Sequence, residues 1–151
     1  MSRPEKDRII NCPPAFAEFK PPGVPRRALN QIVLNIAEYE ALRLADYEGR
    51  DQVDSAGEME ISRPTFTRLL KKARQKLCAM LVEGKSLTIE GGNVHFKANL
   101  IRCRDCQHVF RVKIDQDPPD CPRCGSTRLL SLAEQFGHGR CCRGRGNRRL
   151  R

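Results

Sequence analysis

Four cysteines in the second half of the chain carry its clearest chemical signal. They form two pairs, Cys103-x-x-Cys106 and Cys121-x-x-Cys124, separated by residues 107–120. Each pair predicts a tight knuckle that offers two thiolates, and two such knuckles supply the four ligands of a tetrahedral metal site. Because four thiolates leave no coordination position open, we expect this metal to be structural rather than catalytic.

Zinc is the metal that the four thiolates favour, and the residues around them predict a small β zinc-ribbon module over 99–133. The stretch 108–114 alternates as a strand, 116–120 turns the chain back, and 127–132 predicts a second strand. Iron is the alternative, because Cys121-Pro-Arg-Cys124-Gly125 also resembles the second knuckle of rubredoxins. Gln107 stands where the first knuckle would need the matching glycine.

A second metal site stays open near the end of the chain. Cys141 and Cys142 are adjacent, His138 lies close by, and Cys12 is a distant candidate for a fourth ligand. Adjacent cysteines do not easily share one tetrahedral site, which weighs against this reading. His95 lies in a predicted strand, and we expect it to be an ordinary surface histidine.

A second functional signal lies in the basic segment Ile61–Val82, which predicts a helix. Its apolar residues recur with a helical period, Ser62 is a good N-cap, and Gly84 provides a stop. Cys78 within it is expected to be a small buried residue.

The segment contains no acid, whereas the preceding 36–60 carries eight acids against two bases. This segregation predicts a polyanionic partner for the helix. Its basic residues are Arg63, Arg68, Lys71, Lys72, Arg74 and Lys76.

Two shorter helices are predicted before the basic helix, over 36–48 with Asn35 as N-cap and over 52–59 with Asp51 as N-cap. A short helix, a tight turn and an N-capped basic helix together predict a helix-turn-helix. Glu60 stands where that turn prefers glycine, and Gly57 weakens the short helix by roughly 1 kcal/mol relative to alanine. After Gly84, the segments 87–90 and 93–96 predict a β-hairpin around two glycines.

The predicted fold is therefore a mainly α helix-turn-helix domain over 31–92 that ends in a small β-hairpin, followed by the small β zinc ribbon. A proline-rich and basic extended arm over 1–30 precedes it, and a disordered Gly/Arg-rich tail over 134–151 follows. The 151 residues carry a net charge of +10 and eight cysteines. With no signal-peptide core and no apolar run long enough for a bilayer, we expect a cytoplasmic protein.

Residues 3–92 resemble a family of small prokaryotic proteins of unknown function. The shared marks are F-K-P-x-G-x-P, the helix E-x-E-A-x-R-L-A-D-x-E-G, S-R-x-T-F and L-x-I-E-G-G, all of which stand in this sequence. The resemblance implies DNA binding through a helix-turn-helix similar to region four of the primary bacterial sigma factors. Glu60 and Gly57 depart from the family pattern, and the ribbon and tail lie outside the resemblance.

We expect a transcriptional regulator that binds double-stranded DNA in a sequence-specific manner. We do not expect an enzyme. A homodimer and a contact with RNA polymerase both stay open. The alternatives are an iron- or redox-responsive metal sensor and a protein-interaction module that contacts the transcription machinery. The candidate DNA-binding residues are Arg63, Thr65, Thr67, Arg68, Lys71 and Lys72, with Arg74 and Lys76 further along as phosphate or support contacts.

Overall fold

The computed structural model describes residues 7–138 and 140–143, and these divide into two compact units. Of the described residues, the helical unit contains Asp7, Arg8 and Phe16–Val94. The cysteine-rich unit contains Ile9–Ala15 and the described residues from His95 onward. None of the helices in the described part of the chain is both long and apolar enough to cross a membrane.

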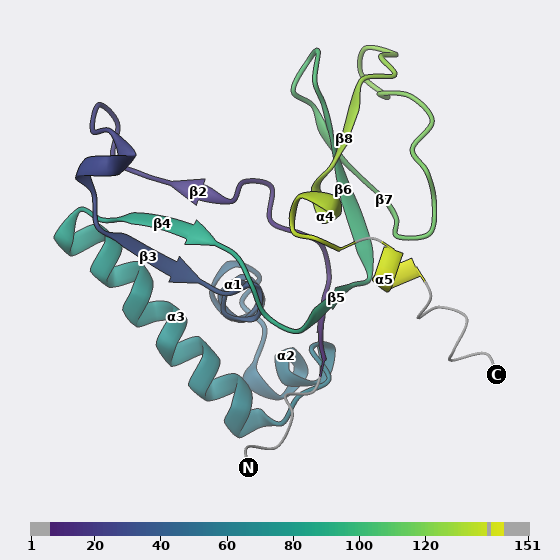
Figure 1. Cartoon of the computed structure of the whole chain (residues 1–151). Helices are drawn as coiled ribbons and strands as arrows, with labels where there is room; N and C mark the ends of the chain where they lie inside the picture. The colour runs from purple at the N-terminus through teal and green to yellow at the C-terminus, as the bar shows by residue number, and fades with distance from the viewer. Residues whose placement is uncertain (1–6, 139, 144–151) are drawn as a thin grey trace. The chain divides into compact units, whose positions relative to one another are not determined.

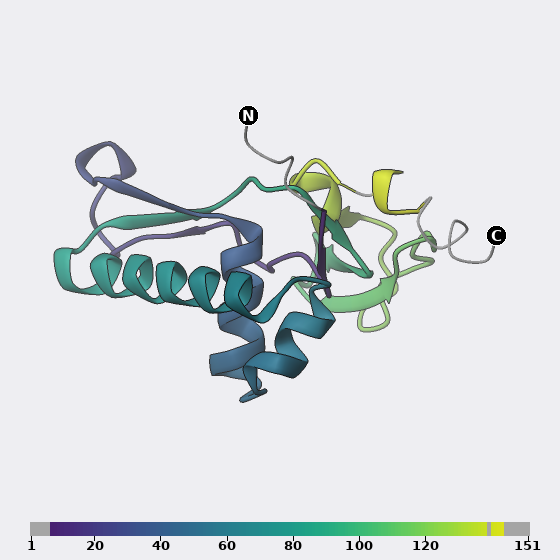
Figure 2. The same cartoon turned by 90° about the horizontal axis from the view of Figure 1, so that it is seen from below.

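The helical unit combines helices with a three-stranded sheet (Figure 1). The sheet has the order β2-β4-β3, in which β4 pairs antiparallel with β2 and parallel with β3. The long helix α3 lies along this sheet, as the view from below also shows (Figure 2). The elements are β2 (Glu18–Phe19), the 3-10 helix η1 (Arg26–Ala28), β3 (Gln31–Leu34), α1 (Ile36–Leu42), the π-helical turn η2 (Arg43–Tyr47), α2 (Gln52–Glu58), α3 (Arg63–Glu83) and β4 (Ser86–Ile89).

The three predicted helix starts are confirmed. The side chains of Asn35, Asp51 and Ser62 each accept a hydrogen bond from the backbone N–H three residues further on, which satisfies a donor that the helix leaves unpaired. These caps fix where α1, α2 and α3 begin.

The apolar stripe of α3 is buried over its first half only. Phe66, Leu69, Leu70 and Ala73 are buried, as predicted, in the core of the helical unit. Further along, the side chain of Leu81 is 72% exposed. Cys78 is also exposed, so its predicted burial is wrong; it lies beyond the part of α3 that the core covers.

The cysteine-rich unit is built on an antiparallel sheet with the order β7-β6-β8 (Figure 1). A separate two-stranded sheet joins β1 and β5, whose first residues, Arg8 and Val94, belong to the helical unit. The elements are β1 (Arg8–Ile10), β5 (Val94–Phe96), β6 (Ala98–Cys103), β7 (Val109–Lys113), β8 (Leu129–Ser131), α4 (Leu132–Gln135) and α5 (Arg140–Arg143).

The predicted hairpin over 87–96 is wrong, because its two strands belong to different sheets. Both edges of β4 are occupied by β2 and β3, so β4 has no edge left for β5. With this sheet, the helical unit mixes α and β structure rather than being mainly α.

The predicted arm over 1–30 is not simply extended. It contributes β1, β2 and η1, and Ile9 and Ile10 are buried in the cysteine-rich unit. The predicted disordered tail over 134–151 is also partly wrong, because α4 runs through Gln135 and α5 covers Arg140–Arg143. The rest of that tail, residues 139 and 144–151, lies outside the described residues, as do residues 1–6 of the arm.

Candidate metal centre and basic helix face

The four predicted metal ligands of the cysteine-rich unit come together. Cys103 Sγ lies 3.5 Å from Cys124 Sγ, and Cys106 Sγ lies 3.6 Å from Cys121 Sγ. All four sulfur atoms lie within 4.8 Å of one another, and all four thiols are free. Zinc–sulfur bonds of about 2.3 Å in a tetrahedron place sulfur atoms roughly 3.8 Å apart, so these thiols fit around one metal ion.

Two matching backbone turns hold these cysteines. In the first, the N–H of Gln107 donates to the carbonyl of Cys103 at 3.0 Å; in the second, the N–H of Gly125 donates to the carbonyl of Cys121 at 2.8 Å. Gln107 has φ 63° and Gly125 has φ 74°, so both turns close through a left-handed residue. The first knuckle thus has the same turn as the second, although Gln107 adopts it at a cost of roughly 1–2 kcal/mol.

The electrostatics of the cluster favour a cation at its centre. The backbone N–H of Cys106 is the main cause that lowers the pKa of Cys103 to about 6, against the effect of burial. The N–H of Ser126 favours the thiolate of Cys124, but contacts with the other three thiols and burial together outweigh it and raise the pKa of Cys124 to about 12. Without a cation, the Cys103 thiol therefore ionises easily, whereas the Cys124 thiol keeps its proton. A bound dication would stabilise all four as thiolates.

The structure also gathers a second cluster in the same unit, which holds His95, His138, Cys141 and Cys142. The three residues that the sequence singled out near the C-terminus are therefore close together. Cys12 is not part of the cluster; its Sγ contacts the side chain of Asn11 instead. His95 was missed, since it precedes the other three by more than forty residues and no short spacing connects them.

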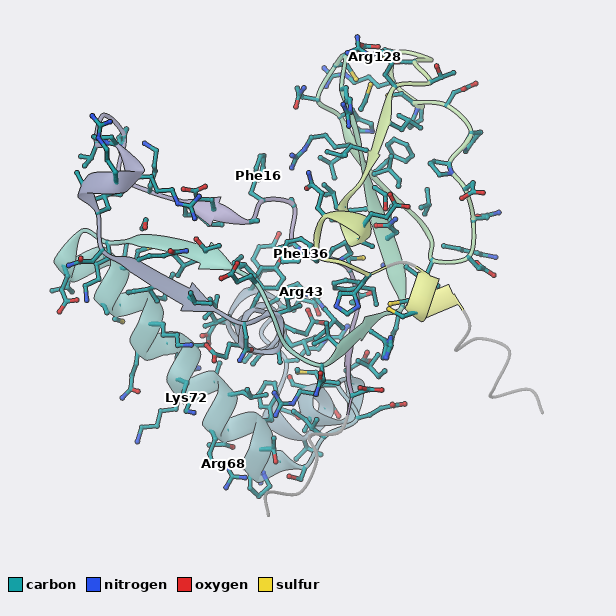
Figure 3. All side chains as sticks on the ribbon, in the orientation of Figure 1. Phe16, Arg43, Arg68, Lys72, Arg128 and Phe136 are labelled. Carbon is teal, nitrogen blue, oxygen red and sulfur yellow. The ribbon has the colours of Figure 1, made fainter. Side chains whose placement is uncertain are left out.

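Five of the six candidate DNA-binding residues lie on the solvent side of the first turns of α3, and Thr65 is partly buried. Arg63, Thr67, Arg68, Lys71 and Lys72 are exposed, opposite the buried stripe. Figure 3 shows the Arg68 and Lys72 side chains extending outward from the helix.

The two threonines among the candidates hold local structure. The hydroxyl of Thr65 lies 2.8 Å from that of the N-cap Ser62. The hydroxyl of Thr67 donates to Gln52 Oε1 at 2.5 Å and to the Arg63 carbonyl at 3.0 Å. Thr67 therefore connects α3 to the start of α2, and both threonines support the α2–α3 arrangement.

The basic residues of α3 fall into two groups. Arg74 donates to Asp46 at 2.7 and 3.0 Å, and Lys76 donates to the Val33 carbonyl at 2.8 Å and to the buried Glu38 carboxylate at 3.0 Å. Hydrogen bonding to Asp46 raises the pKa of Arg74, and hydrogen bonding to Arg74 lowers the pKa of Asp46. Among the described residues, the four other cations have no such partner; they are Arg63, Arg68, Lys71 and Lys72.

Comparison with known proteins places this sequence in a family. A family model described as "Protein of unknown function DUF134" matches residues 1–97. The chain belongs to the DUF134 family. No solved structure matches the chain.

Relatives of this DUF134 chain extend beyond the residues that the family model covers. A UPF0251 protein of Chloroherpeton thalassium is 42% identical over 97% of this chain and 99% of its own length. A UPF0251 protein of Moorella thermoacetica is 43% identical over 95% of this chain and 94% of its own length. The aligned length therefore takes in both clusters of cysteine and histidine residues.

Proposed function

We propose that this chain is a sequence-specific DNA-binding protein, a transcriptional regulator, in which α2 and α3 act as a helix-turn-helix and the four-cysteine cluster holds a structural zinc ion. The observation that carries the proposal is the division of the α3 cations. Arg74 and Lys76 are neutralised by Asp46 and Glu38, whereas the cations of the first turns have no partner among the described residues. A cationic helix face without internal counterions suits a nucleic-acid backbone and base edges.

The local geometry supports α3 as the helix that enters the major groove. Its N-terminal turns are exposed, and α2 packs against it just before, joined by a turn at Glu60 with φ 55°. In helix-turn-helix proteins the N-terminal residues of the second helix reach the base edges. We assign base contacts to Arg68 and Lys72, with Arg63 and Lys71 as further contacts to bases or phosphates.

The decisive experiment is capture of fragmented genomic DNA by the purified protein at physiological salt, followed by sequencing. The wild type is compared with Arg68→Ala/Lys72→Ala. A charge-matched control, Arg27→Ala/Lys113→Ala, removes two exposed cations outside α3. We expect a few enriched sites that the control keeps and the α3 variant loses, because bidentate base contacts contribute about 1–3 kcal/mol of discrimination each.

Two outcomes would refute the α3 assignment. One is equal enrichment by wild type and the α3 variant, and the other is enrichment that the charge-matched control loses to the same degree. The salt dependence gives an independent reading, because several phosphate contacts make affinity fall steeply as salt rises. Weak dependence would favour a protein partner.

The proposed role of the four-cysteine cluster is structural and involves no catalysis. Replacing Cys103 and Cys121 with serine should abolish the fold of the β7-β6-β8 sheet, because two of the four ligands are lost, while α1–α3 persist in the circular dichroism spectrum. A colourless protein with bound zinc supports this reading. A red protein with visible absorption would instead favour iron and a redox or sensor role.

A protein contact is the second candidate function, and a groove in the helical unit favours it. The groove has a volume of about 680 Å³ and is mostly apolar, with Leu34, Tyr39, Leu77 and Met80 among its lining residues. A second copy of the chain is the simplest occupant, since DNA-binding proteins of this class commonly act as dimers. Sedimentation of the purified protein over a dilution series tests this. A monomer at every concentration would leave only a different protein, such as RNA polymerase.

A further inference from the structure

We propose that His95, His138, Cys141 and Cys142 form a second, separate metal site that binds zinc through two imidazole nitrogens and two thiolates. All four residues belong to the cysteine-rich unit, and their ligand atoms lie within 4.8 Å of one another. Two nitrogens and two sulfurs in a tetrahedral set are a ligand combination that favours zinc.

The distances within the cluster match a tetrahedral ion. Zinc–sulfur bonds of about 2.3 Å and zinc–nitrogen bonds of about 2.0–2.1 Å place two sulfurs roughly 3.8 Å apart, and a sulfur and a nitrogen about 3.5 Å apart. The Cys141 and Cys142 sulfurs are 3.8 Å apart. Cys141 Sγ lies 3.3 Å from His138 Nδ1, and Cys142 Sγ lies 3.6 Å from His95 Nδ1.

The adjacent position of Cys141 and Cys142 is therefore no obstacle to shared coordination. Both residues lie in α5, which turns their sulfurs to the separation that one metal ion requires. That separation is well beyond the bond length of a disulfide, about 2.05 Å, so the two thiols are free.

The surroundings of the cluster favour the deprotonated ligands that a metal needs. The backbone N–H of Phe96 donates to Cys142 Sγ at 3.2 Å, and a hydrogen bond of this kind stabilises a thiolate. The half-buried His138 ring lies beside the His95 ring, with centroids 6.2 Å apart, so both imidazoles border the same small space. The Phe96 ring packs edge-on against His138 with centroids 5.3 Å apart and orients it.

The site would connect the end of the described chain to the strands of its unit. His95 is in β5, whereas Cys141 and Cys142 are in α5, a helix of only four residues. Such a short helix has almost no stability of its own. A metal ion shared between β5 and α5 supplies the cross-link that holds it there, as in other small metal-stabilised modules.

The first test is zinc content of the full chain, measured by elemental analysis after purification. The wild type should hold two zinc ions per chain, and Cys141→Ser/Cys142→Ser should hold one. His95→Ala should also hold one, whereas His108→Ala, which removes the third histidine, should keep both. His95→Cys should retain two zinc ions, because a thiolate can replace the imidazole. The same zinc content in the wild type, the His95→Ala variant and the double-serine variant would overturn the proposal.

The second test does not depend on any variant folding normally. Cys141 and Cys78 are both exposed, so free thiols at these positions should react with an alkylating reagent at similar rates. With zinc bound, Cys141 should be protected until a chelator is added, whereas Cys78 should react equally with and without the chelator. Rapid labelling of Cys141 in the zinc-loaded wild type would overturn the proposal. Because neither test involves DNA, their outcome is independent of the proposed regulatory function.

Discussion

Glu60 illustrates how one residue can hold a turn that its side chain disfavours. The N–H of Ile61 donates to the Ala56 carbonyl and the N–H of Glu60 donates to the Gly57 carbonyl, which is the pattern of a Schellman motif at the end of α2. That motif needs a left-handed residue at Glu60, where φ is 55°. The turn prefers glycine because its backbone is left-handed at this position. Glutamate adopts the same conformation with backbone strain.

Glu60→Gly should raise the free energy of unfolding by about 0.5–1 kcal/mol, because the relief of strain exceeds the extra entropy of glycine in the unfolded chain. Urea unfolding followed by the helical circular dichroism signal measures the change. Glu60→Gln is the control, since it removes the charge but keeps the Cβ, and it should not stabilise. Equal stabilisation by both variants would trace the effect to charge instead of backbone strain.

Lys76 and Lys72 are four residues apart on α3 and should have opposite roles. Lys76 pairs with the buried carboxylate of Glu38, whereas Lys72 is exposed. Lys76→Ala should lower the free energy of unfolding by about 1–3 kcal/mol, because it leaves a buried carboxylate poorly paired. Lys72→Ala should change it by less than about 0.5 kcal/mol.

The same pair of variants separates stability from binding. Lys72→Ala should weaken DNA affinity in an equilibrium shift assay, whereas folded Lys76→Ala at low temperature should keep most of it. Glu38→Gln in the Lys76→Ala background should recover part of the lost stability, because the uncompensated charge is gone. If Lys72→Ala destabilises as much as Lys76→Ala does, the division of the α3 cations into two groups is wrong.

At the scale of elements, the two knuckles of the four-cysteine cluster predict that metal binding depends on pH. The backbone N–H of His108 favours the Cys106 thiolate, but burial and neighbouring thiols outweigh it and raise its pKa; the pKa of Cys124 is raised to about 12. Both cysteines therefore carry protons at neutral pH in the metal-free chain and lose them when a metal binds.

Zinc affinity of this cluster should therefore rise with pH, by about 100-fold or more per unit near neutrality, because binding displaces at least these two protons. Competition with a chromophoric chelator between pH 6 and 8 measures it, in the Cys141→Ser/Cys142→Ser background so that only one cluster binds. Below pH 6 the pKa of Cys103, about 6, adds a further proton to the competition. An affinity that does not change with pH would show that the thiols are already ionised before metal binding.

Elements defined by neighbouring residues could be predicted from the sequence, and elements defined by distant ones could not. The caps at Asn35, Asp51 and Ser62 act over three residues, so the starts of α1, α2 and α3 were correct. The strands that pair with β4 are Glu18–Phe19 and Gln31–Leu34, which are distant in the sequence. The hairpin prediction was wrong because it rested only on the two glycines that follow β4.

The two clusters also differ in whether neighbouring or distant residues define them. Cys-x-x-Cys spacing marks a knuckle locally, so the first cluster could be assigned before its geometry was known. His95 joins Cys142 only because β5 and α5 meet in the fold, and its own neighbours in sequence give no sign of a ligand. Cys78 was misjudged because the helical period does not reveal where the core stops covering α3.

At the scale of the whole molecule, the two units are not two consecutive stretches of the chain. Ile9–Ala15 belongs to the cysteine-rich unit, although it precedes the helical unit in the chain. Ile10 is fully buried there, and its carbonyl accepts the N–H of Lys97 at 2.9 Å. The carbonyl of Asn11 accepts the N–H of Ala98 at 2.9 Å. An N-terminal segment is therefore a structural part of the cysteine-rich unit.

A matched pair of core substitutions tests this division. Ile10→Ala and Ile36→Ala remove the same group from positions that are 0% and 1% exposed. Each should cost about 2–5 kcal/mol, because deletion of buried methyl groups loses transfer free energy and leaves a cavity. Ile10→Ala should speed amide hydrogen exchange in β6 and β7 and leave α1 and α3 protected, and Ile36→Ala should do the reverse. Faster exchange in both units from either substitution would mean that the chain unfolds as one cooperative structure.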